Sequence, residues 1–339
     1  MGRGLVVVLL GLAAACGRRP GNEPVAVAAP SLPEPDKTWN VFPPGARAAD
    51  LAPAIEEGLR NGKGAEGEAE RETPDQATSA EFVRFVILRA AERHGARYRK
   101  EFFHVVVGAG IELPEGALLI QRDWHRPGMI TGNNEQPQAY GLAVVVEPGA
   151  PRPFHPAVVA AVQAFVAALA RKVPLHPDCV VAMEELAYTT HDPADAAERE
   201  LANKARKAVP PLKPDGTLEI VSSKGSIQVA YELRHTTPGI AVGMMLRHGF
   251  DGENRGMLFR YAWRATRRFW MKNCRIPIAL AYIARGRIEQ IVAMQPQWGA
   301  PAGELRYYQS STPVRWVLEM PAGWFADHGV KIGDPVRID

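Results

Sequence analysis

Only a few residues of this sequence could do chemistry as a group, and cysteine is the first type to consider. The chain has three cysteines, Cys16, Cys179 and Cys274. They form no CxxC pair, which excludes a zinc ribbon and a thioredoxin-like redox motif. Cys179 and Cys274 fall in different predicted domains, so we expect two buried free thiols in preference to a disulfide.

A second group consists of polar residues set in apolar motifs of the C-terminal third. These residues could line a shared pocket. Alternatively, two of them, Lys272 and Glu319, form a structural ion pair beneath a sheet, which is the interpretation we favour. No Ser/His/Asp grouping, phosphate loop or metal-ligand spacing accompanies them, and the nearby methionines are predicted to fill the core. The four pocket candidates are Arg247, Lys272, Asn273 and Glu319.

The first residues predict export. Arg3 precedes an apolar run, Leu5–Ala15, and Cys16 follows it directly. The run is too short to span a bilayer, which needs about twenty residues. Ala13-Ala14-Ala15-Cys16 resembles a bacterial lipobox, which implies lipidation of Cys16 and an anchored protein of the cell envelope, with the outer membrane facing the periplasm preferred. The alternative is an ordinary secretory signal in which Cys16 is incidental.

Length and charge limit the remaining classes of function. A chain of 339 residues favours two domains. Its 40 basic and 37 acidic residues give a formal net charge of +3 without a basic stripe, so no nucleic-acid partner is predicted, and membrane contact is expected through the lipid anchor alone. We predict a signal peptide at 1–15, a Pro-rich tether at 16–38, a first domain at 39–208, a linker at 209–217 and a second domain at 218–339.

The first domain is predicted to be α/β, with a mixed central sheet and helices on both faces. Apolar runs at 103–107, 118–120, 141–146 and 179–183 are typical of buried strands. Pro156 opens an apolar helix, and the capping-box spacing at Thr78–Glu81 with the apolar pattern that follows predicts another helix through Ala90.

The order of these segments resembles the N-acetylmuramoyl-L-alanine amidases and peptidoglycan recognition proteins over about residues 39–195. The matching stretches are Phe103–Gly108, Gly116–Arg126, Gly132-Asn133, Gln138–Val144 and Pro177–Val181. The resemblance implies a zinc ion held by two histidines and a third ligand. Here Pro43-Pro44 and Ala182-Met183 stand at the two histidine positions, and only Asp192 keeps a ligand type, so the resemblance implies a degenerate amidase without metal or catalytic residues.

The same resemblance places a sugar or peptide groove near five residues, which we predict to bind substrate: His104, Trp124, His125, Arg126 and Asn133. The alternative is structural, with Trp124 in the core and His125 as a satisfied histidine. A rearranged metal site built from His104, His125, His191 and Asp192 is a further alternative.

The second domain is predicted to be small and mainly β, with strands at 218–221, 227–231, 278–283, 288–292 and 314–319 and a hairpin turn at 284–287. Its motifs resemble domain-of-unknown-function family 192. They are Gly243–Arg247, Gly256–Phe259, Phe269–Asn273, Leu318–Trp324 and His328–Asp334. Cys274 stands where that family usually has threonine, and no activity is implied.

Together these patterns predict an envelope lipoprotein that binds peptidoglycan or muropeptides without hydrolysing them and without a cofactor. One alternative is an active zinc amidase that cleaves the lactyl–L-alanine amide. Another is a non-catalytic protein-interaction module of the envelope.

Overall fold

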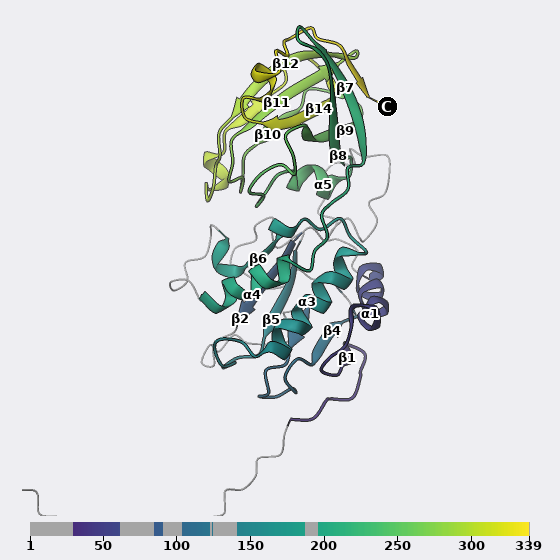
Figure 1. Ribbon diagram of the computed structural model, residues 1–339, viewed down its shortest axis with the longest axis vertical. Helices are drawn as coiled ribbons and strands as arrows, with labels where there is room; N and C mark the ends of the chain where they lie inside the picture. Colours follow the sequence, from purple (N-terminus) through teal and green to yellow (C-terminus); the bar gives the residue numbers. More distant parts are fainter. Residues whose placement is uncertain are drawn as a thin grey trace, which may run out of the picture.

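The computed structural model describes residues 30–61, 85–90, 104–122, 124, 141–186 and 196–338. Within them the chain builds a six-stranded sheet from its N-terminal part and a seven-stranded sheet from its C-terminal part (Figure 1). None of the helices in these ranges is long and apolar enough to cross a membrane. The mixed α/β class of the first part and the mainly-β class of the second are confirmed.

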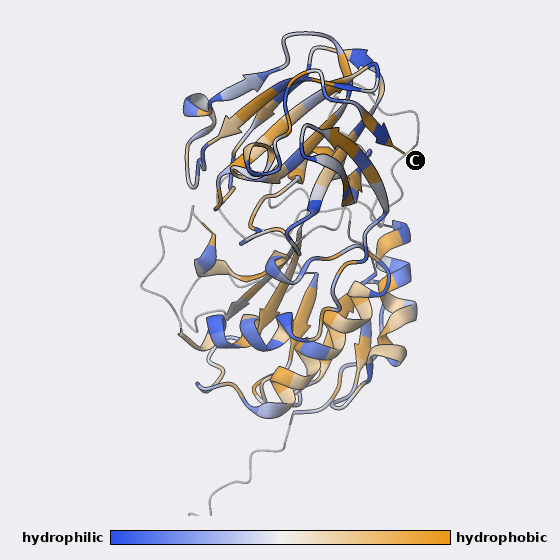
Figure 2. Cartoon of the chain, turned by 45° about the horizontal axis from the view of Figure 1, so that its top comes forward, coloured by the Kyte–Doolittle hydropathy of each residue, from blue (hydrophilic) through white to orange (hydrophobic). Residues whose placement is uncertain are grey.

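The N-terminal sheet has the order β1-β4-β3-β5-β2-β6. Strands β3, β5, β2 and β6 run parallel, whereas β4 is antiparallel to both of its neighbours. The inner strands β3 and β5 are apolar throughout because both of their faces are buried, and they stand out as hydrophobic in Figure 2. The bounds are β1 Trp39–Phe42, β2 Phe85–Ala90, β3 Val105–Val107, β4 Leu118–Gln121, β5 Gly141–Val146 and β6 Val180–Ala182.

One predicted element is wrong. The segment around Phe85–Ala90 was expected to be helical, and it is strand β2, which lies between β5 and β6. A short run of large apolar residues is compatible with a helix or with a fully buried strand, and periodicity alone does not separate the two. Parallel pairing on both sides decides the outcome here.

Three described helices pack on this sheet: α1 (Ala48–Asn61), α3 (Pro156–Ala170) and α4 (Ala196–Arg206). Helix α3 begins where Pro156 predicted, with His155 as N-cap, and it lies between α1 and α4 and contacts both. In Figure 1 all three cover the same side of the sheet. The expected helices on both faces are therefore found on one face only among the described residues.

The C-terminal sheet has the order β12-β11-β14-β9-β8-β7-β15 and is antiparallel apart from the β8–β9 pair. An isolated bridge between Arg287 and Pro335 brings its two edge strands together, so the sheet curls into a half-barrel. The bounds are β7 Gly216–Ser222, β8 Gly225–Arg234, β9 Arg255–Ala265, β11 Ile278–Ala284, β12 Arg287–Met294, β14 Val314–Pro321 and β15 Val336–Ile338. The five strands and the hairpin turn predicted here are confirmed.

The half-barrel has an apolar cluster on each face of its sheet. In β11 the odd residues Ala279, Ala281 and Ile283 join one cluster, and the even residues Ile278, Leu280, Tyr282 and Ala284 join the other. This period of two is the geometry of a strand that is buried on both faces. Smaller elements complete the part: α5 (Thr237–Val242), α6 (Trp324–Asp327) and a ribbon of β10 (Arg268–Trp270) and β13 (Tyr307–Gln309).

The two parts share apolar contacts. Val242, Met245 and Leu246, at the end of α5 and just after it, belong to the same buried cluster as the N-terminal sheet and its helices. Trp270 packs against that cluster from β10. The end of α5 and the residues just after it therefore lie at the contact between the two parts.

Candidate functional site at the junction of the two parts

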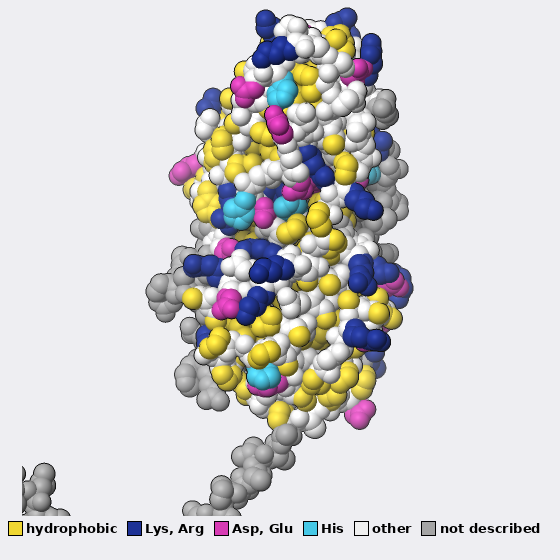
Figure 3. Space-filling model, in the orientation of Figure 1, with side chains coloured by type: hydrophobic (Ala, Val, Ile, Leu, Met, Phe, Trp, Pro, Cys, Tyr) yellow, Lys and Arg dark blue, Asp and Glu magenta, His cyan; other side chains and the backbone are white. Residues whose placement is uncertain are grey.

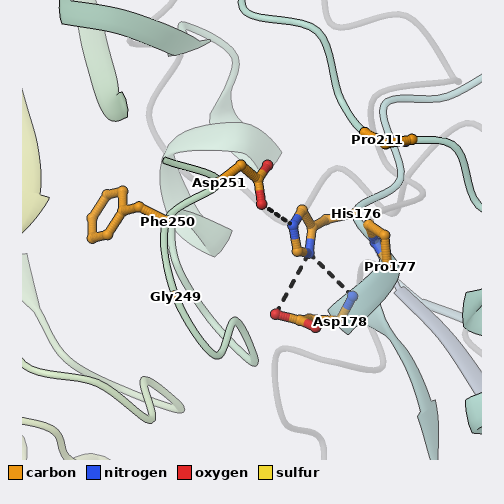
Figure 4. A pocket seen from close by; sticks show the side chains of 7 residues that line it. All are labelled: His176, Pro177, Asp178, Pro211, Gly249, Phe250 and Asp251. Atoms are coloured by element: carbon orange, nitrogen blue, oxygen red, sulfur yellow. Dashed lines mark hydrogen bonds and ion pairs between the residues drawn. The ribbon is translucent and has the colours of Figure 1, made fainter. Parts of the chain in front are cut away.

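A pocket of about 350 Å³ lies at this junction. The N-terminal part contributes the start of the short 3-10 helix η3 (Pro177–Cys179) with the preceding His176, and the C-terminal part contributes the loop of Gly249, Phe250 and Asp251 (Figure 4). Pro211, in the connection between the parts, completes the lining. Figure 3 shows histidine, acidic and basic side chains gathered in a band at this level of the molecule.

His176 is the centre of the pocket's hydrogen bonding. Its Nε2 lies 3.0 Å from Asp251 Oδ1, and its Nδ1 accepts a hydrogen bond of 3.1 Å from the backbone N–H of Asp178. Burial lowers the pKa of His176, and the charge of Arg247 lowers it further, so the neutral ring is favoured near pH 7. Because Nδ1 accepts and Nε2 donates, the ring has no free lone pair and cannot act as a general base.

Asp178 joins the two parts directly. Its Oδ2 accepts a hydrogen bond of 2.8 Å from the backbone N–H of His248, and its Oδ1 lies 3.2 Å from His248 Nδ1. Burial raises the pKa of Asp178, but the hydrogen bonds from His248 and the neighbouring histidines outweigh it and lower the pKa below its usual value. The carboxylate therefore holds the loop that follows α5 against η3.

Behind the pocket a buried ion cluster fixes the same loop. Arg247 is 2% exposed and donates from Nη1 and Nη2 to the two oxygens of Glu232, at 3.0 and 2.9 Å. Burial raises the pKa of Glu232, but the arginines Arg247 and Arg234 more than compensate and lower it to about 2. Arg247 also reaches Asp251 Oδ2 at 3.3 Å, which connects the cluster to His176.

Neither of the two cysteines that the structure describes is a nucleophile. Cys179 and Cys274 are free and buried, as predicted. Burial raises the pKa of the Cys179 thiol to about 12 and also raises that of Cys274, so both stay protonated.

All four pocket candidates of the C-terminal domain, Arg247, Lys272, Asn273 and Glu319, are buried, and none of them lines the junction pocket. Arg247 belongs to the ion cluster, whereas Glu319 faces the apolar cluster beside its strand partners Leu280 and Met257. Burial raises the pKa of Glu319 to about 8, and the cation that lowers it is Arg234. The predicted ion pair with Lys272 is not among the contacts that Glu319 makes. Asn273 is buried with φ +55°, and neither polar atom of its side chain has a hydrogen-bond partner among the described residues.

Of the five predicted groove residues, the structure describes His104 and Trp124. His104 is buried, its Nδ1 accepts a hydrogen bond of 2.9 Å from the N–H of Ala143, and its ring meets Trp124 edge to face. The Trp124 indole packs on Gly58 of α1. Both side chains are buried, which favours the structural alternative for these two residues, and the groove itself stays a prediction. His125, Arg126 and Asn133 lie outside the described residues, as do Cys16, His191 and Asp192.

The two positions that the resemblance assigns to histidine ligands do not follow neighbouring strands. Strand β1, which leads to Pro43 and Pro44, lies at one edge of the sheet, and β6, which leads to Met183, lies at the opposite edge. The strand beside β6 is β2, in which Leu88 pairs with Ala182.

The described residues at this shared strand end do not fit zinc. Leu88, Ala182 and Met183 are all buried in the apolar core. Aliphatic side chains offer no donor atom, and a thioether is too soft a ligand to replace an imidazole. Across the described ranges, no group of three or more His, Cys, Asp or Glu residues is placed to hold a metal ion.

Sequence reasoning missed His176, Asp178, Glu232 and Asp251. The signals were local: an acidic residue in the apolar strand 227–233, and a His-Pro-Asp run just before a predicted strand. Charged residues are almost never buried unless they are paired, so Glu232 alone indicated a buried partner.

Comparison with known proteins adds one assignment. Residues 219–338 match the family DUF192, described as "Uncharacterized ACR". This part of the chain is a DUF192 domain. No protein of curated function matches the chain, and no match supports an amidase or peptidoglycan recognition domain in the N-terminal part.

Two solved structures are similar to the chain. One is a protein of unknown function from Novosphingobium aromaticivorans DSM 12444, 26% identical over 36% of this chain and 84% of its own, with a TM-score of 0.33. The other, from Sinorhizobium meliloti 1021, is provisionally described as a transcription regulator; it is 26% identical over 38% of this chain and 97% of its own, with a TM-score of 0.32. The ion cluster of Glu232 and Arg247 lies within the DUF192 domain.

Proposed function

We propose that the chain is a non-catalytic binding protein of the bacterial envelope, and that its ligand is peptidoglycan or a fragment of it. The observation that carries the proposal is the strand end shared by β2 and β6. The resemblance assigns a zinc-binding histidine to the Ala182-Met183 position at this strand end, and the residues there are the buried and apolar Leu88, Ala182 and Met183.

The junction pocket supports the non-catalytic part of the proposal. Its histidine is neutral and uses both ring nitrogens, and the buried cysteine beside it is a protonated thiol. The ion cluster behind it is fixed by the bidentate contact of Arg247 with Glu232. These features are those of a structural joint that holds two parts in one orientation.

The test is to incubate the full chain with purified sacculi in the presence and absence of zinc. We expect the protein to sediment with the sacculi and no soluble muropeptide to appear. Release of muropeptides with new L-alanine amino termini would show an active amidase and overturn the non-catalytic assignment. Absence of both release and sedimentation would refute peptidoglycan as the ligand and favour a protein-interaction module.

Variants locate the binding surface. Arg126→Ala and Asn133→Ala, at positions that the resemblance assigns to a groove, are expected to reduce sedimentation with sacculi. Arg171→Ala, which removes one exposed arginine at the end of α3, is the matched control and should leave sedimentation unchanged. An equal loss in all three variants would indicate non-specific attraction to the anionic wall.

A further inference from the structure

A second pocket lies entirely within the DUF192 domain, at the end of three neighbouring strands. It has a volume of about 280 Å³ and is lined by Ala262–Arg264 of β9, Ile283–Gly286 at the β11–β12 turn, and Arg315-Trp316 of β14. The lining contains three arginines and two tryptophans, and none of the lining residues is acidic. A concave site with this composition differs from an ordinary solvated surface, where both signs of charge are interspersed.

An irregularity in the sheet builds one wall of the pocket. Val314 pairs with Ala265 and Trp316 pairs with Arg260, so Arg315 alone faces the four β9 residues from Tyr261 to Arg264. Such a bulge re-aims side chains and interrupts the ladder. The Arg315 Nε donates to the Tyr261 carbonyl at 2.9 Å, and no other N–H of this guanidinium is bonded to a described residue.

The other two arginines also lack counter-charges. Arg264 and Arg285 are exposed, and neither makes an ion pair or a side-chain hydrogen bond within the described part of the chain. Arg285 and Gly286 form a two-residue turn with φ +53° and +70°. Asparagine, aspartate or glycine is the favoured residue at the first of these positions, and an arginine is conformationally costly there. A strained residue that brings a charge to a cavity points to a ligand.

We propose that this pocket binds a phosphoryl anion carried on an organic group. Three unopposed guanidinium groups match a ligand with more than one negative charge, and a phosphate monoester carries about −1.5 to −2 near pH 7. Guanidinium groups bind phosphate oxygens in bidentate fashion. Trp263, which is 46% exposed, provides an apolar face for the group that carries the phosphate. The ligand is a lipid headgroup or a free phosphate ester.

The experiment measures binding of two probes to the full chain. Inorganic pyrophosphate is titrated calorimetrically, and vesicles of phosphatidylcholine with phosphatidic acid are compared with vesicles of phosphatidylcholine alone in flotation. Binding of pyrophosphate without selective flotation assigns a free phosphate ester, and flotation that requires phosphatidic acid assigns a lipid headgroup. Either result supports the pocket, and failure of the wild type to bind both probes overturns it.

Two variants and a control connect binding to the pocket. Arg285→Asn removes a charge while favouring the turn, so it should fold at least as well as the wild type. Arg264→Gln removes a charge that makes no ion pair or side-chain hydrogen bond within the described part of the chain. Each variant should weaken binding of the probes about tenfold or more, because it loses a charge-assisted hydrogen bond to the ligand. Arg287→Gln removes the same charge from the same hairpin, at a position that does not line the pocket. Its affinity for the probes should stay within about twofold of that of the wild type. Equal losses in all three would overturn the site.

Discussion

Glu319 carries its carboxyl group into the apolar interior of the half-barrel. Burial raises its pKa to about 8, the charge of Arg234 compensates only in part, and Oε2 has no hydrogen-bond partner among the described residues. The neutral acid is therefore the folded form over most of the ordinary pH range. In the unfolded chain the same group ionises near pH 4.3. This difference makes the stability of the DUF192 domain depend on pH.

The direction of this pH dependence follows from the number of protons that the folded and unfolded states bind. Between about pH 4.3 and 8 the folded state holds a proton on Glu319 that the unfolded state has lost, so this group's contribution to stability falls as the pH rises through that window, by at most about 1.4 kcal/mol per pH unit. Glu319→Gln abolishes the contribution. We expect the melting temperature of this variant, minus that of the wild type, to increase steadily from pH 5 to pH 8 in thermal denaturation.

Glu304→Gln, at an exposed position, is the control and should show a constant difference. A flat difference for Glu319→Gln as well would mean that the carboxyl is ionised in the fold.

At the scale of elements, the close packing of β9 against β14 depends on Gly256. A Cβ at this position would lie 2.5 Å from Met320 Sδ, 2.8 Å from the Glu319 carbonyl oxygen and 2.9 Å from Leu318 Cδ1. The methionine can move, but the carbonyl belongs to a paired central strand and cannot move without disturbing the sheet.

Gly256→Ala is therefore expected to destabilise the DUF192 domain by about 1–3 kcal/mol, the usual cost of overpacking. Gly252→Ala provides the control, because the nearest atom to its Cβ would be Arg255 Cβ at 3.8 Å, and its effect should stay within about 0.5 kcal/mol. Chemical denaturation followed by near-UV circular dichroism gives both values. Equal stability of the two variants would contradict the close approach of the strands.

The elements also show what a sequence can predict. Strands β5 and β11 and helix α3 were predictable because long apolar runs, a two-residue turn and Pro156 mark them locally. Strand β2 was not, because only its pairing with β5 and β6 separates it from a helix. The junction pocket was equally hidden. His176 and Asp251 are 75 residues apart, and no local pattern records that contact.

For the whole molecule, the junction determines whether the two parts unfold together. Apolar contacts from Val242, Met245 and Leu246 provide part of the coupling, and Arg275 of the DUF192 domain donates to the Glu185 carbonyl at 2.8 Å. The bonds of Asp178 to His248 and of His176 to Asp251 provide the polar part. A continuous core with such bonds favours a single cooperative transition, although two-domain proteins often unfold in steps.

We expect calorimetry at pH 7.5 to show one transition for the wild type and two for the double variant Asp178→Ala, Asp251→Ala. A fall in pH should also separate the unfolding of the two parts into two transitions. The pKa values of His176 and Asp178 are both lower in the folded chain than in the unfolded one, so their contributions are lost as the pH falls, first below about 6.5 for the histidine and then below about 4 for the aspartate. The control is Arg337→Ala, which removes an exposed ion pair with Glu219 between β15 and β7, away from the junction. This variant should keep a single transition. One transition in the double variant would show that apolar contacts alone couple the two parts, and two transitions in the wild type at pH 7.5 would show that the parts are independent.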